Sequence, residues 1–561
     1  MKLRFLVTIL YTLIVTVAFN SSYAKNLDFN YNAKNIANYF SALLSFDDFN
    51  YQKSENFFKK INDSKKNNTN QSSKYIQSLV NSGKYIEAER YSKGLENKKK
   101  SNFESKLILG LSEFKKGNYV RAKKYFNELE KNQEHLAVSR ILKISLNIWS
   151  SIQEEGILSI QNIPERYRNF KVIQNALAHC FFNTSETNKV FNEILNNEKD
   201  NFSRYYFFYA DYLLNQNKNL EAEKIINFAS KKYPKNLLIN QLKKTYFEKE
   251  KNYNNFDCEN KNHIIAEIFY VISNALSTQT NYELSNFYVN LSKYLNPKFS
   301  SYNSLLGENF FVLKKYEKSK KIFIELSKTG SIYEWYSSRQ IAFILYEQNK
   351  KEEAVKSLSK AYGRIDPNIY QTYDFANFLR NNEDYENSIK LYTSVLSKIN
   401  KNHELYPKVL DRRGTAYERI KKLKLSEEDL LMSLKISPNQ PYVINYLAYS
   451  WLEQGKNLDR SLEMLRKANE LKKDDGYITD SLGWALYKRK KFEESKKFLK
   501  AAIILMPQDP IVNDHFADCL WKNNQKIQAR YYWNYVLKLK DTEEKLKKSI
   551  EKKLIFGLEK S

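Results

Sequence analysis

The sequence predicts an all-α fold in which helical hairpins stack into a right-handed solenoid. Two observations lead to this prediction: small residues recur at intervals close to 34, and prolines follow some of them at a fixed distance. Glycine and proline are otherwise scarce, at 13 and 9 of 561 residues, which excludes a collagen-like or low-complexity chain. Because one hairpin cannot bury its apolar stripe alone, neighbouring hairpins must stack and share it.

The repeat is clearest in the C-terminal part of the chain. Its register is set by small residues spaced 34, 35 and 34 apart, namely Gly414, Ala448, Gly483 and Ala517. A second small series stands twelve positions after three of them, at Ser426, Ser495 and Ala529. Pro438 and Pro507 each follow a glycine of the first series by 24 residues. We expect the small residues where the two helices of a hairpin cross and each proline just after the second helix.

Weaker copies extend the pattern toward the N-terminus. Gly307, Ala342 and Ala376 keep spacings of 35 and 34, whereas the step from Ala376 to Gly414 is 38, so about four residues are inserted within 400–407. Fainter copies are marked by Ala210 with Ala222 and Ala229, by Gly117 with Tyr119 and Ala122, and by Gly83 with Tyr85 and Ala88. Residues 137–200 have a helical period but match the repeat poorly.

The first residues have the pattern of an export signal. Lys2 and Arg4 precede an apolar run over 5–19, and the small residues Ser22 and Ala24 fit a cleavage site. The run is shorter than the ~20 residues of a spanning helix. We therefore expect a cleaved signal peptide and a soluble periplasmic product, with an uncleaved N-terminal anchor as the alternative. No cysteine stands near the cleavage site, so we expect no lipid anchor.

The predicted layout has five parts. They are a signal peptide, a degenerate N-terminal helical arm, a polar loop that separates two arms, a C-terminal repeat array and a capping helix, over 1–24, 25–247, 248–263, 264–541 and 542–561. The last segment is lysine-rich and amphipathic, with Leu546, Ile550 and Leu554 at helical spacing, so its apolar side is expected to cover the final hairpin.

The clearest copy resembles a known repeat family. Residues 480–507 begin with Asp-Ser-Leu-Gly-Trp-Ala-Leu-Tyr, end with Ala-Ala-Ile-Ile-Leu-Met-Pro, and resemble a tetratricopeptide repeat. Residues 438–557 look like the C-terminal half of a group of proteobacterial envelope tetratricopeptide proteins. Some members are adaptors that hold a carboxy-terminal-processing protease near its cell-wall hydrolase substrates, so the resemblance implies an adaptor role. This chain lacks the lipid-acceptor cysteine that such members carry.

Residue patterns of known catalytic and metal sites are absent from the sequence. No phosphate-binding glycine motif, nucleophile elbow or HExxH motif occurs. Cys180, Cys258 and Cys519 are far apart, so the sequence defines neither a disulfide nor a zinc site, and we expect three separate thiols. The acidic pairs Glu352-Glu353, Glu427-Glu428 and Glu493-Glu494 are expected in the first turn of a second helix, where the helix dipole favours them. We expect no enzyme activity, no cofactor and no metal.

The formal charge of +27 comes from 91 Lys and Arg against 64 Asp and Glu. Phosphate neutralisation drives nucleic-acid binding, but these cations are spread over the whole chain and export removes the protein from nucleic acid. We therefore expect no nucleic-acid partner. Contact with anionic lipid head groups or acidic wall polymers is expected to be peripheral at most.

The expected binding surface is the concave face formed by the first helices of successive hairpins. Inward positions should lie one, four and five residues after the small residue, or three and six before it. The candidates are Tyr336, Arg339, Tyr346, Tyr373, Asn377, Arg380, Tyr442, Asn445, Tyr449, Asp480, Trp484, Tyr487, Asp518 and Trp521. The alternative for each is packing between neighbouring first helices. The Lys/Asn pattern that grips chaperone tails is replaced by Tyr373, Arg412 and Tyr442, which disfavours such tails.

These observations predict a non-catalytic periplasmic scaffold or adaptor that binds proteins in the cell envelope, including a protease or an assembly factor among its possible partners. Aromatic residues and arginine are the types that dominate binding hot spots. The alternative function is a structural protein that binds the cell wall or a polysaccharide.

Overall fold

The computed structural model describes residues 33–61, 69–129, 136–196 and 201–558. The predicted signal peptide, 1–24, lies outside these residues. The chain forms two compact units, which we call unit 1 and unit 2, and they divide between Ile344 and Leu345. The division falls in the last turn of helix α18 (Ser331–Glu347).

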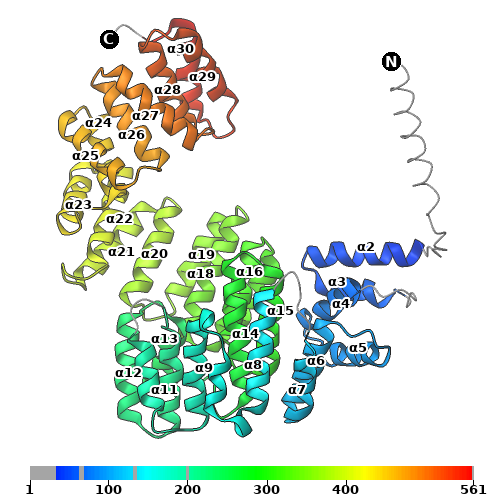
Figure 1. Ribbon diagram of the computed structural model, residues 1–561. Helices are drawn as coiled ribbons and strands as arrows, with labels where there is room; N and C mark the ends of the chain where they lie inside the picture. The colour runs from blue at the N-terminus through cyan, green and yellow to red at the C-terminus, as the bar shows by residue number, and fades with distance from the viewer. Residues whose placement is uncertain (1–32, 62–68, 130–135, 197–200, 559–561) are drawn as a thin grey trace, which may run out of the picture. The chain divides into compact units, whose positions relative to one another are not determined.

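Unit 1 consists of helices in its described residues (Figure 1). Its α-helices are α2 (Ala33–Asp47), α3 (Tyr51–Lys59), α4 (Thr69–Asn81), α5 (Tyr85–Asn97), α6 (Phe103–Lys115), α7 (Tyr119–Asn127), α8 (Leu136–Glu155), α9 (Arg168–Phe181), α10 (Thr187–Leu195), α11 (Tyr205–Asn215), α12 (Asn219–Lys232), α13 (Leu237–Glu248), α14 (Lys261–Thr278), α15 (Tyr282–Leu295), α16 (Tyr302–Val312) and α17 (Tyr316–Leu326). Short 3₁₀ turns occupy Ile157–Asn162, Glu165–Tyr167 and Ser327–Thr329.

Unit 2 continues the same alternation of first and second helices. Its helices are α19 (Lys351–Tyr362), α20 (Ile369–Asn381), α21 (Tyr385–Ser397), α22 (Tyr406–Arg419), α23 (Leu423–Ile436), α24 (Pro441–Glu453), α25 (Leu458–Leu471), α26 (Gly476–Lys488), α27 (Phe492–Leu505), α28 (Pro510–Lys522), α29 (Lys526–Lys538) and α30 (Glu544–Phe556). Over the described ranges the only β-type pairing is an isolated bridge between Asn254 and Phe299. The expected all-α array of stacked hairpins is confirmed.

The small residues stand where the two helices of a hairpin cross. A Cβ atom added to Gly483 of α26 would lie 2.7 Å from Cγ of Leu499 on α27. Twelve positions on, the Ser495 hydroxyl donates a 2.7 Å hydrogen bond to the Gly483 carbonyl. Ser319 makes the same bond to Gly307 at 2.8 Å. The absent side chain therefore lets the helices approach closely, and the serine ties them together in a region that excludes water.

Each hairpin also turns at a fixed point. Seven residues after Gly307, Ala342 and Gly483, the chain adopts a left-handed conformation at Lys314, Asn349 and Lys490, with φ of 57°, 60° and 59°. Left-handed residues commonly end helices. The turn therefore follows the same period as the small residues. It keeps this period even at residues other than glycine, for which the left-handed conformation is less favourable.

Unit 1 folds back on itself, so the expected separation at 248–263 is wrong. Helix α15 packs against α4. The Tyr85 hydroxyl donates to the Asn290 carbonyl at 2.8 Å, and the Asn290 amide donates to Asn81 Oδ1 at 3.0 Å. Lys74 pairs with Glu283 across the same contact. Residues from both sides of the predicted loop thus share one core, and the division between units lies beyond the loop, between Ile344 and Leu345.

The expectation of three separate thiols is also wrong. Cys180 near the end of α9 forms a disulfide with Cys258 in the segment between α13 and α14, with their Cα atoms 5.8 Å apart. The two residues are 78 positions apart in sequence, and no spacing motif links them. Cys519 remains a buried free cysteine, in line with its predicted role as a small core residue.

The array ends in a helix that covers the last hairpin. Ile550 of α30 is fully buried in a cluster with Trp533 and Val536 of α29. Among the described helices, none combines the length and apolarity needed to cross a membrane.

Candidate binding groove

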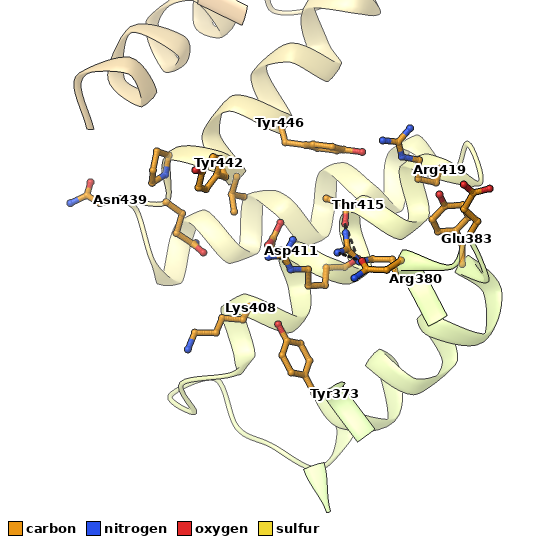
Figure 2. A pocket seen from close by; sticks show the side chains of 16 residues that line it. Tyr373, Arg380, Glu383, Lys408, Asp411, Thr415, Arg419, Asn439, Tyr442 and Tyr446 are labelled. Carbon is orange, nitrogen blue, oxygen red and sulfur yellow. Dashed lines mark hydrogen bonds and ion pairs between the residues drawn. The ribbon is translucent and has the colours of Figure 1, made fainter. Parts of the chain in front are cut away.

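A hollow of about 900 Å³ lies along the first helices of three consecutive hairpins in unit 2, α20, α22 and α24 (Figure 2). We call it the basic groove. Its charged and aromatic lining includes Tyr373, Arg380, Lys408, Arg412, Arg419 and Tyr446. Four cationic side chains face two acidic ones, Glu383 and Asp411, so the groove carries excess positive charge.

The helix crossings determine which side chains reach the groove. Gly414 of α22 faces α23, where an added Cβ would lie 3.0 Å from Cγ of Leu430. The opposite face of α22 is therefore left for the groove, and it carries Lys408, Arg412 and Arg419 at helical spacing. Helix α20 begins at a capping box formed by Asn368 and Gln371, and α24 begins with a proline, which fixes where each first helix starts.

Arg380 lies at the centre of the groove (Figure 2). One of its Nη atoms donates to Thr415 Oγ1 at 3.4 Å and the other to Asn381 Oδ1 at 3.0 Å. Its Nε is buried and has no hydrogen-bond partner. Arg412 approaches its sequence neighbour Asp411 at 3.5 Å, and Arg419 lies 3.9 Å from Glu418. Burial raises the pKa of Asp411, against the attraction of Arg412 and Arg380.

Farther along the array, the first helices α24, α26 and α28 carry acidic side chains, and each of these has a strong partner. Trp484 Nε1 donates to Glu453 at 3.0 Å, and His515 Nδ1 lies 2.9 Å from Asp480. Lys553 of α30 donates to Asp514 at 2.7 Å and to Asp518 at 2.8 Å. The carboxylates at this end of the unit 2 array are thus engaged in internal contacts.

Burial governs the protonation of this acidic group. It raises the pKa of Asp518 to about 6, with help from Asp514 and against Lys553. Burial lowers the pKa of His515, but Asp480 and the two neighbouring carboxylates outweigh it, so the pKa of His515 is raised. The His515 ring stacks on Trp484 with the centroids 3.9 Å apart. The histidine and Asp480 therefore form a buried contact between successive first helices, which becomes an ion pair when the ring is protonated.

The structure places the predicted residues in three settings. Tyr373, Arg380 and Tyr442 line the basic groove, and Tyr442 is 54% exposed. Other candidates are used in internal contacts. Asn377 accepts a hydrogen bond from Tyr392, Asp480 is bonded to His515, and Asp518 is bonded to Lys553. Trp484 stacks on Tyr487, and Trp521 packs on Trp533. Tyr346, Asn445 and Tyr449 are half-buried.

Tyr336 and Arg339 belong to unit 1, where the Tyr336 hydroxyl donates to Glu308. The structure therefore does not collect all the candidates in one groove. Sequence reasoning missed Arg412, Arg419 and Tyr446 as groove residues. A signal was present for Arg419, which stands five positions after Gly414, one of the inward positions. The contact between Asp480 and His515 was also missed, although both residues lie just before a small residue of the repeat.

The smaller predictions about acidic residues have mixed outcomes. Glu352 with Glu353, and Glu493 with Glu494, lie in the first turns of α19 and α27 as expected. Glu427 and Glu428 do not, because α23 begins already at Leu423. Asp475 caps α26 by accepting from the Ile478 amide at 3.2 Å. No cluster of three metal-ligating side chains occurs within the described part of the chain.

The same crossing recurs along the chain. A small residue meets a serine twelve positions later and a large residue sixteen positions later, and a left-handed turn connects the two helices. This is the geometry of one repeat family. The TPR repeat-containing protein PA4667 of Pseudomonas aeruginosa is 25% identical over 172 residues, which are 30% of this chain and 28% of that relative. The chain is built of repeats of the tetratricopeptide type. No family model matches it.

Solved structures similar to this tetratricopeptide repeat protein include the hetero-tetramer of the APC/C proteins Cut9 and Hcn1, with a TM-score of 0.38 and 13% identity over 94% of this chain and 96% of that one. YrrB, described as a TPR protein with an unusual peptide-binding site, has a TM-score of 0.28 and 14% identity over 35% and 97% of the two chains. A thermophilic TPR protein of Thermus thermophilus, TTC0263, has a TM-score of 0.29 and 14% identity over 34% and 100%. Likeness at this level says nothing further about the chain.

Proposed function

We propose that this tetratricopeptide repeat protein is a non-catalytic scaffold that binds a protein partner in the basic groove. The observation that carries the proposal is the groove itself, which three successive first helices line with tyrosines and arginines instead of an apolar seam. Such side chains give much contact area and strong hydrogen bonds to a peptide.

We also propose that the scaffold works in the periplasm, as an adaptor for an envelope protease or assembly factor. The tripartite pattern of residues 1–24 supports export. The disulfide between Cys180 and Cys258 supports it independently, because disulfides persist in oxidising compartments and are rare in the cytosol. Cell fractionation with an antibody to the protein tests the compartment, and recovery with cytosolic markers would contradict it.

Photo-crosslinking in the source organism tests the binding role. A photoreactive amino acid at Tyr442, which is 54% exposed in the groove, should yield a discrete crosslinked protein. The matched control is Tyr531 on the second helix α29, which is 67% exposed and outside the groove, and it should yield none of that product. Identical crosslinks from both positions, or none from Tyr442, would contradict the proposal. Crosslinks to wall polysaccharide would favour the structural alternative.

A further inference from the structure

We propose that the basic groove binds an extended acidic peptide segment, with Arg380, Arg412 and Arg419 receiving its carboxylates. This inference rests on the proposed function and specifies the chemistry of the partner. These three arginines differ in their hydrogen bonding from Arg413 and Arg204, two arginines that serve the packing of helices.

Two other arginines, Arg413 and Arg204, are each held by a carboxylate in two parallel hydrogen bonds. Arg413, next in sequence to Arg412, donates to both carboxylate oxygens of Asp429 at 2.7 and 2.8 Å. Arg204 of unit 1 does the same with Glu267, at 2.7 and 2.8 Å. Such bidentate pairs are the strongest hydrogen bonds available to arginine. Both arginines are thus paired with a carboxylate inside the protein.

The groove arginines have no comparable pair among the described residues. Arg412 and Arg419 have contacts of 3.5 and 3.9 Å to the carboxylates of their own sequence neighbours. Glu418 is already an acceptor for the Tyr446 hydroxyl at 2.7 Å. Arg380 donates to two uncharged acceptors, Thr415 Oγ1 at 3.4 Å and Asn381 Oδ1 at 3.0 Å. Donors are therefore left over, and a ligand with carboxylates supplies the acceptors that they lack.

The carboxylates at the C-terminal end of the unit 2 array are engaged in internal contacts, so they favour a basic ligand less than free carboxylates would. Glu453, Asp480, Asp514 and Asp518 are each paired by a tryptophan, a histidine or Lys553. Burial also raises the pKa of Asp411, the carboxylate beside Arg412. Along the groove, the four cationic side chains Arg380, Lys408, Arg412 and Arg419 therefore outnumber the two carboxylates Glu383 and Asp411.

The lining favours a peptide over an anionic polymer without side chains. Tyr373, Tyr442 and Tyr446 lie among the arginines, and tyrosine offers a rigid apolar face beside its hydroxyl. Neighbouring helices pack roughly 10 Å apart, so three first helices span about 20 Å, the length of about six extended residues. A hollow of about 900 Å³ accommodates several side chains of such a segment.

Fluorescence anisotropy with the full chain tests the inference. The probe is a fluorescein-labelled dodecapeptide of alternating Glu and Phe, in 50 mM salt, beside a peptide in which Lys replaces Glu. We expect Arg380→Gln, Arg412→Gln and Arg419→Gln each to raise the Kd of the acidic peptide about tenfold. The matched control is Arg466→Gln on the second helix α25, where Arg466 pairs with Glu494 outside the groove, and its Kd should stay within about twofold of wild type.

Charge reversal makes the result independent of folding losses. Arg412→Glu should lose the acidic peptide and gain the Lys-containing one. Equal binding of both peptides by the wild type, or no loss in any of the three groove variants, would overturn the inference. A version of the acidic peptide with an amidated C-terminus separates two sources of carboxylate. Loss of binding would assign the contact to the terminal carboxylate, and unchanged binding would assign it to the Glu side chains. Both results support the proposal. Polygalacturonate serves as an anionic polymer without amino-acid side chains. If it displaces the labelled peptide as strongly, per carboxylate, as the unlabelled acidic peptide does, the assignment to a peptide is overturned.

Failure of this inference is distinguishable from failure of the proposed function. If Tyr442 crosslinks to a protein but no acidic peptide binds, the groove binds a partner of different chemistry. If neither occurs, both the scaffold role of the groove and its acidic ligand are wrong.

Discussion

The closest helix crossings depend on a single missing methyl group. A Cβ on Gly307 would lie 2.7 Å from the ring of Phe323, which is fully buried. We therefore expect Gly307→Ala to destabilise the protein by about 1–3 kcal/mol, the usual result of overpacking a core. The measurement is the midpoint of urea unfolding, followed by circular dichroism.

Gly94 is the matched control for this prediction. It lies inside α5 of the same unit, and a Cβ there would meet nothing within 4 Å. Gly94→Ala should raise the midpoint, because alanine favours a helix by about 1 kcal/mol over glycine. Equal effects of the two substitutions would show that helix propensity, not the crossing, controls both positions.

His515 should make stability depend on pH. Its pKa is raised in the folded state by Asp480, with Asp514 and Asp518 adding to the effect, so folding favours the protonated ring. The stabilisation is present below the unfolded pKa of about 6.5 and is lost as pH rises through the folded value. We expect the unfolding midpoint to fall from pH 6.5 to 8.5, and less so in His515→Gln. A pH range above about 6 avoids most of the titration of Asp518.

The pairing of His515 with Asp480 shows what a one-dimensional pattern omits. The sequence predicts that Asp480 stands on a first helix near its small residue, and the structure agrees. Whether Asp480 meets solvent or a partner depends on the side chain that the next hairpin places opposite it, 35 residues later. The repeat gives positions on a face, whereas contacts between faces depend on both partners. Predicted groove residues therefore separated into exposed ones, such as Tyr442, and packed ones, such as Trp484.

At the scale of elements, α30 is bound to the array by charge as well as by apolar contact. Lys553 lies between Asp514 and Asp518 and donates to both. Lys553→Met leaves two largely buried carboxylates without their cation, a kind of loss that costs about 3–5 kcal/mol. We expect the last hairpin to unfold at lower urea, monitored by the fluorescence of Trp521 and Trp533, which pack together near α30.

Lys552→Met provides the control for Lys553→Met. Lys552 is exposed on the same helix, so the substitution removes the same charge without uncovering a buried carboxylate. Its unfolding curve should match the wild type. Similar losses in the two variants would mean that net charge, not the buried ion pairs, holds α30 in place.

At the scale of the whole molecule, the sequence predicts the hairpins but not the closure of unit 1. The period identifies Gly307 and Ala210 as crossing residues because each signal is local, within one hairpin. The packing of α15 on α4 joins residues about 200 positions apart, through Asn290 with Asn81 and Tyr85. No interval in the sequence encodes such a pair, and the polar run over 248–263 is as compatible with a covered connection as with an exposed break.

The disulfide gives a test of this closed unit. Cys180 and Cys258 tie α9 to the connection before α14, and linking residues 78 positions apart restricts the unfolded chain. The chain-entropy model gives about 4 kcal/mol for a loop of this size. Cys180→Ser, Cys258→Ser and the double variant should therefore unfold at lower urea, and the wild type in reductant should behave like the double variant.

Thiol titration in denaturant checks the pairing directly. Without reductant only Cys519 should react, and after reduction all three cysteines should do so. Cys519→Ala is the control, since it removes the free thiol of unit 2 and should leave the effect of reductant on unfolding unchanged. Three reactive thiols in protein purified without reductant would contradict the disulfide and remove one support for an oxidising compartment. One reactive thiol in protein taken directly from its source, with free thiols blocked at lysis, would show that the bond forms in the cell, as export requires.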